Sequence, residues 1–240
     1  MVELLYSIRQ KKTTLYSATL TIGRIVTIML ENPWGVSTMS NENKNYNGRA
    51  KILTKLFRYL FLLSIAIAVA SFMIGDVFAQ FLPNLYVPGA ILNIACSFGY
   101  SLVLLRMDSV DKQYRTAGYC MLIASAVSLL SIDTSENASN FVLLFSVATS
   151  FVQFIGQYNE MTAHDTLMIE ADFNLSEKWT FLRKCYMISF LTYCVSLLLL
   201  MVISSVGVVI TIVSSLAMTV ISAVKVYFLY RSWKIFEAQS

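Results

Sequence analysis

Forty consecutive residues, from Cys185 to Val224, contain no Asp, Glu, Lys, Arg or His. A helix that crosses the hydrocarbon core of a bilayer needs about 20 residues, so this run is long enough for two spans and a tight turn. A pair of soluble helices of this length would carry charged residues on its exposed faces. The run therefore predicts a membrane hairpin with spans at about 180–203 and 207–229.

The remainder of the chain has the composition of a membrane protein. Only 13% of its 240 residues are charged and 57% are hydrophobic, whereas a soluble domain carries about 25% charged residues. Four further apolar segments precede the hairpin, at about 55–80, 88–105, 116–132 and 141–157. We therefore predict an all-α, polytopic integral membrane protein with six transmembrane helices.

The basic residues predict the orientation of these spans. All 18 Lys and Arg residues fall in or beside the N-terminal segment, two alternate connections and the C-terminus, and the other three connections contain none. Because cytoplasmic loops are enriched in Lys and Arg, both termini are expected to be cytoplasmic, and we expect a multi-pass protein of the plasma membrane. The net charge of +4 then reflects contact with anionic lipid rather than with nucleic acid.

This orientation divides the chain into three parts. Residues 1–54 form a cytoplasmic N-terminal segment, residues 55–230 the transmembrane domain and residues 231–240 a cytoplasmic tail. Arg24 interrupts the apolar stretch of the N-terminal segment, which argues against a span there. Two interpretations remain open: residues 13–31 form an interfacial amphipathic helix, or Met39 is the true start.

Small and polar residues recur at helical spacing on several spans. Asn93 and Ser97 share one face of the second span, Gln153 lies on the fourth, and Ser189 and Thr192 lie on the fifth. Such residues commonly allow helices to pack closely and to hydrogen-bond to one another. The functional alternative is a modestly polar cavity for a small neutral ligand, with Asn93 and Gln153 as the best candidates because a buried amide needs a partner.

The cytoplasmic segment 158–178 is the most chemically varied part of the chain. Glu160 and the only histidine, His164, are i, i+4 neighbours on a predicted helix, and Asp165 follows. A solvated helix face is the simplest interpretation; a contact with a protein partner or a second copy, or a metal site shared with a partner subunit, are alternatives. Asn174 is predicted to cap the next helix, with Glu177 at the third position. Lys225 is expected to be hydrated at the inner end of the last span.

No catalytic, nucleotide-binding or metal-binding motif is present, and we predict neither a cofactor nor a metal site within one chain. The pattern favours a non-catalytic accessory, scaffold or sensing subunit that acts through the segment 158–178. The second hypothesis is a transporter, or a substrate-binding permease subunit, for a small neutral solute. A membrane enzyme that uses Glu160, His164 and Asp165 is the third.

Overall fold

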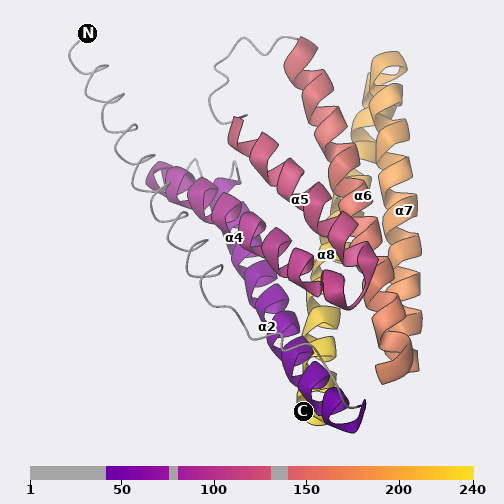
Figure 1. Cartoon of the computed structure of the whole chain (residues 1–240). Helices are drawn as coiled ribbons and strands as arrows, with labels where there is room; N and C mark the ends of the chain where they lie inside the picture. Colours follow the sequence, from indigo (N-terminus) through magenta and orange to yellow (C-terminus); the bar gives the residue numbers. More distant parts are fainter. Residues whose placement is uncertain (1–41, 76–80, 131–139) are drawn as a thin grey trace, which may run out of the picture.

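A computed structural model describes residues 42–75, 81–130 and 140–240, and this part of the chain contains helices and no strand. The prediction of an all-α protein is confirmed. Two short 3-10 turns, Pro83–Leu85 and Met107–Ser109, flank the second of the long helices. The six helices labelled in Figure 1 are α2 (Glu42–Ile74), α4 (Tyr86–Arg106), α5 (Lys112–Leu130), α6 (Asn140–Ala171), α7 (Phe173–Val202) and α8 (Ser204–Gln239).

Within the described ranges, three helices are long and apolar enough to cross a membrane. They contain the segments Arg49–Ile74, Tyr86–Ser109 and Ser205–Gln239. Each overlaps a predicted span, and the helices α5, α6 and α7 overlap the other three. The helices α6 and α8 continue beyond the predicted spans, to Ala171 and Gln239, because polar residues are compatible with a helix that leaves the membrane. The predicted interfacial helix at 13–31 and the alternative start at Met39 lie outside the described residues.

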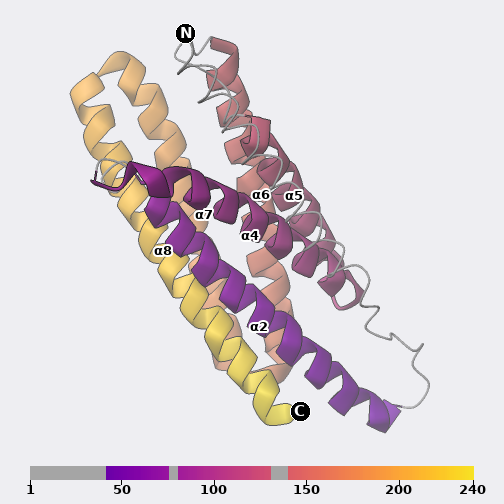
Figure 2. The same cartoon turned by 90° about the vertical axis from the view of Figure 1, so that its left-hand side faces the viewer.

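The six helices form a ring in chain order. Each packs against the next, and α8 packs against α2 to close the ring. Figure 2 shows α2 and α8 running side by side. In Figure 1 the N-terminal end of α2, the α6–α7 connection and the C-terminal end of α8 lie towards the bottom, which we call the inner end. The α7–α8 connection lies at the opposite, outer end.

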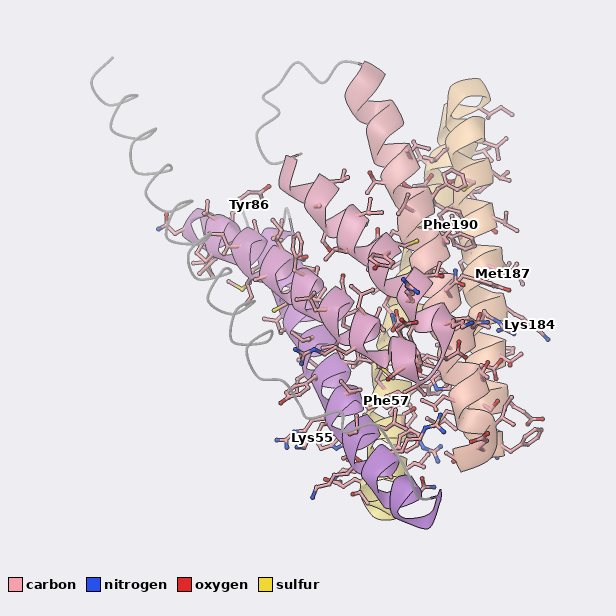
Figure 3. The ribbon with its side chains drawn as sticks, viewed as in Figure 1. Lys55, Phe57, Tyr86, Lys184, Met187 and Phe190 are labelled. Carbon is pink, nitrogen blue, oxygen red and sulfur yellow. The ribbon has the colours of Figure 1, made fainter. Side chains whose placement is uncertain are left out.

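The core of the protein lies nearer the inner end. Phe57 of α2, Tyr114 of α5 and Trp179 of α7 are completely buried there. Figure 3 shows Phe57 within the bundle, whereas Lys55 and Lys184 lie at its periphery. Towards the outer end, α7 and α8 instead carry large exposed apolar side chains, including Ile188, Leu191, Val209, Val213 and Leu216. Such an apolar surface is compatible with contact with lipid.

A single residue separates α6 from α7. Asp172 has an extended backbone and its carboxylate accepts a 3.1 Å hydrogen bond from the Leu175 amide, so Asp172 is the N-cap of α7. The prediction that Asn174 caps this helix is wrong by two residues. The carboxylate of Asp172 is an equally good cap, and it lies earlier because α6 continues as far as Ala171.

Candidate functional site

A buried carboxylate joins three helices near the inner end. Glu160 of α6 is fully buried. Its Oε2 accepts a 2.7 Å hydrogen bond from Nζ of Lys225 on α8, and its Oε1 accepts one from the hydroxyl of Tyr100 on α4. Lys225 also donates to Oε1 of Gln157, one helical turn before Glu160, over 3.0 Å. The ion pair is therefore supported by hydrogen bonds on both sides, which a buried charge requires.

His164 extends this arrangement by one helical turn. Its Nε2 lies 3.3 Å from Oε1 of Glu160, and its Nδ1 lies 2.7 Å from the hydroxyl of Tyr114 on α5. An ionised carboxylate only accepts hydrogen bonds, so Nε2 donates to Glu160 and Nδ1 of a neutral imidazole accepts from Tyr114. We refer to Tyr100, Tyr114, Glu160, His164 and Lys225 as the buried network.

Aromatic rings from the two remaining helices enclose the imidazole of His164. The ring of Phe57 on α2 lies 5.2 Å from it, and the ring of Trp179 on α7 lies 4.7 Å from it, both between centroids. All six helices of the ring therefore meet around the buried network. Water is excluded from the imidazole, because His164 itself is completely buried.

The electrostatic balance of the network follows from these contacts. Glu160 and His164 both lie beyond the predicted span 141–157. Burial raises the pKa of the Glu160 carboxyl. The Lys225 ammonium and the hydrogen bond from His164 together lower this pKa by more than burial raises it, so the pKa lies below its usual value. Burial lowers the pKa of His164, and this outweighs the attraction of Glu160. The network thus holds an ionised carboxylate, a neutral imidazole and an ammonium, with no net charge.

A cavity of about 180 Å³ adjoins Lys225, between α6, α7 and α8. A cavity of about 150 Å³ can hold benzene, so this one has room for a solute of similar size. Its apolar wall is formed by Met161, Met218 and Ile221. Its polar lining consists of Gln153, Gln157, Tyr186, Ser222 and Lys225.

The structure brings one of the five predicted ligand-pocket residues to this cavity, Gln153. Asn93 instead donates a 2.8 Å hydrogen bond to Ser71 of α2, and Ser97 donates to Asn93 over 3.4 Å. Asn93 therefore joins α4 to α2, and Ser97 supports Asn93 from within α4. Ser189 and Thr192 lie on α7 outside the cavity lining, and the hydroxyl of Thr192 is bound to the carbonyl of Ile188 in its own helix.

The structure separates Asp165 from Glu160 and His164. Its two carboxylate oxygens accept 2.6 Å hydrogen bonds from Ser176 and Thr180 of α7, and Arg183 lies 3.5 Å away. Asp165 therefore fastens α6 to α7. In the part of the chain that the structure describes, no three His, Cys, Asp or Glu side chains converge to hold a metal ion.

Two expectations about exposure were wrong. Glu160 and His164 are buried rather than on a solvated face, because α7 folds back along α6 and covers the imidazole with Trp179. Lys225 is also buried rather than hydrated, because Glu160 and Gln157 bind its ammonium inside the bundle. Neither Glu160 nor His164 can therefore offer its side chain to a partner in this conformation.

Sequence reasoning missed Tyr100, Tyr114, Tyr186 and Lys225 as members of the site. One signal was available: Lys225 ends the forty-residue uncharged run. A cation beside so long an apolar segment needs a counter-charge, and Glu160 was an available carboxylate.

Comparisons with protein-family models, with curated proteins and with solved structures give no match for this chain. A functional assignment therefore rests on the geometry of the buried network and of the cavity beside it.

Proposed function

We propose that this chain is a six-span membrane protein that binds a small solute near its inner end, either as a transporter or as the substrate-binding subunit of a permease. The observation that carries this proposal is the cavity beside Lys225, whose ammonium is held by the buried Glu160 carboxylate. Ionisable residues within membrane proteins are costly and commonly mark substrate or ion pathways.

Helix lengths support six spans with both termini on the cytoplasmic side. At 1.5 Å per residue, about 20 residues cover the 30 Å hydrocarbon core. In α7, 20 residues separate the outer end at Val202 from Arg183, both included, and in α8, 22 residues run from Ser204 to Lys225. In α4, 21 residues run from Tyr86 to Arg106. The basic residues of these three helices would then lie at one level, with the cavity just inside that boundary.

The test is retention of a small molecule by the purified full-length protein, measured by native mass spectrometry. A co-purifying molecule in fixed ratio is expected in the wild type, and Gln153→Leu is expected to abolish its retention. Asn93→Leu is the matched control, since Asn93 lies outside the cavity lining. Equal retention in both variants would rule out this cavity as the binding site.

A second candidate function is an accessory, scaffold or sensing subunit without catalytic activity. It is favoured by the tip of the α6–α7 hairpin, where Ile169 is 53% exposed and Phe173 is 64% exposed. About ten residues, or 15 Å of helix, separate this tip from Arg183, so these apolar side chains would lie in the cytoplasm. A protein partner or a second copy of the chain would cover them.

The test of this second function changes only the tip of the segment 158–178, because Glu160 and His164 of that segment belong to the core. Ile169→Ser and Phe173→Ser together should abolish co-purification of the partner, or dissociate a homo-oligomer. Leu216→Ser, an exposed apolar position on α8, is the control. An association that survives both changes at the tip would refute the accessory-subunit function.

A further inference from the structure

The cavity beside Lys225 is rich in hydrogen-bond donors. Lys225 has three N–H groups, of which Glu160 and Gln157 each accept one. Because Lys225 occupies the carbonyl oxygen of Gln157, the NH₂ group of this amide is left for other partners. The amide of Gln153 and the hydroxyl of Tyr186 add further donors to the lining.

The side chains that line the cavity also carry a net positive charge. Lys225 is the one charged residue among those that line the cavity, and none of them is acidic. Glu160, which neutralises Lys225, lies behind it rather than in the cavity wall. Met161, Met218 and Ile221 add apolar side chains to the same lining. A short apolar body with one acceptor-rich, negatively charged group matches this combination.

We propose that the cavity binds a small monocarboxylate together with one proton, which is taken up from water by the carboxylate of Glu160. This inference rests on the proposed function, since it names the solute class for the same cavity. The solute carboxylate accepts hydrogen bonds from Lys225 and from the amide of Gln157. Lys225 then turns from Glu160 towards the solute carboxylate, and Glu160 is left as a neutral carboxyl group.

The charge balance of the site explains why Glu160 takes up a proton when the solute binds. Without solute, the Glu160–Lys225 pair is neutral, and a monoanion would leave one uncompensated negative charge beside a buried ion pair. Such a charge is strongly unfavourable in a low-dielectric environment. When the solute draws Lys225 away, Glu160 loses the ammonium that keeps it ionised, and its burial then favours protonation. Anion and proton therefore enter together, and the occupied site is again neutral.

The other groups around Glu160 allow this protonation. Among the described residues, the titratable groups that face Glu160 are Tyr100 on α4, Tyr114 on α5, His164 on α6, Tyr186 on α7 and Lys225 on α8. On α2, Phe57 lies against His164. Tyr100 and the neutral His164 remain hydrogen-bonded to a protonated Glu160 through its carbonyl oxygen.

The experiment is isothermal titration calorimetry on the full chain in lipid nanodiscs. The probes are butyrate and benzoate, with butyramide and benzamide as neutral matched probes. Titrations in buffers of different ionisation enthalpy count the protons taken up, and a pH series gives the change in Kd. We expect the carboxylates to bind with uptake of about one proton, and Kd to rise about tenfold per pH unit.

The variant Glu160→Gln distinguishes a proton that Glu160 takes up from a proton that the solute brings in as its neutral acid. The variant imitates a protonated Glu160, so butyrate should bind without proton uptake and with a Kd that no longer changes with pH. Asp165→Asn, in the same helix but outside the cavity lining, should behave like the wild type. Infrared difference spectra of the wild type with ¹³C-labelled butyrate should show a new protonated, unlabelled carboxyl group, independently of any variant.

Four outcomes would overturn the inference. Carboxylate binding without proton uptake would contradict the coupling, and proton uptake that persists in Glu160→Gln would show that the solute itself carries the proton. Binding of the amides in preference to the carboxylates would replace the anion with a neutral solute and leave the proposed function intact. If neither series binds and no molecule is retained during purification, both the inference and the solute-binding function fail.

Discussion

The ammonium of Lys225 lies 2.7 Å from the carboxylate of Glu160, across 65 positions of sequence, and neither side chain is more than 9% exposed. Among the described residues, the one opposite charge paired with the Lys225 ammonium is the Glu160 carboxylate. Lys225→Met should therefore lower the free energy of unfolding by about 3–5 kcal/mol, because it leaves a buried carboxylate without its counter-ion. The double variant Glu160→Gln/Lys225→Met should be closer to the wild type. Unfolding in mixed detergent micelles measures both, and an equal loss in the two would contradict the pairing.

The stability of the protein should fall as the pH is lowered through the range in which histidine normally titrates. The unfolded chain binds a proton at His164 near pH 6.5, whereas burial lowers the pKa of this imidazole in the folded state. The unfolded state therefore binds more protons below about pH 6.5, and the stability contributed by neutral His164 is lost as the pH falls towards the folded pKa. His164→Gln should remove this dependence, which thermal melts at pH 7.5 and 5.5 can measure. His164 is the only histidine, so a slope unchanged in the variant would refute this assignment.

The hydrogen bonds of Asp165 should contribute to stability and not to solute retention. Asp165→Ala leaves the hydroxyls of Ser176 and Thr180 without their acceptor, and the expected loss of unfolding free energy is about 1–3 kcal/mol. The small molecule should still be retained in native mass spectra at its wild-type ratio. Loss of the ligand from a folded Asp165→Ala protein would link Asp165 to the cavity.

The contact between α4 and α5 depends on a position without a side chain. A Cβ atom at Gly118 would lie 2.7 Å from Cγ of Leu105 and 3.0 Å from its backbone nitrogen, closer than real contacts allow. Gly118→Ala should therefore separate the two helices and lower the free energy of unfolding by about 1–3 kcal/mol. Thr116→Ala, at an exposed position of the same helix, should have little effect. A melting temperature as high as that of the wild type would show that the helices can move apart at no cost.

The proposed orientation predicts which positions can be labelled from each side. In a chain without native cysteines, Asn84→Cys, in the short turn before α4, should react with a membrane-impermeant maleimide added outside. Ser109→Cys, after the same helix, should react only when the membrane is permeabilised. Both positions are exposed in the structure. The reverse pattern would place the termini outside, and labelling of both from one side would remove this span.

The sequence was sufficient to predict where the helices lie in the chain, but not to predict which helices contact one another. A long run without charge predicts two apolar helices, and α7 and α8 indeed cover Cys185 to Val224, but they extend seven and ten residues beyond the inner ends of the predicted spans 180–203 and 207–229. Helical spacing places residues on one stripe, but it does not say which helix that stripe meets. Asn93 did need a partner, and it found Ser71 on α2 rather than a ligand. Glu160 has polar neighbours in sequence, and its burial depends on α7 and α8, which follow it in the chain.

The closure of the ring by α8 against α2 also has a consequence for how the protein is made. Glu160 precedes Lys225 by 65 residues, so its carboxylate has no counter-ion until α8 has been made. A chain truncated before α8 would therefore hold an unpaired acidic group and leave α2 with an open edge. Only the addition of α8 removes both.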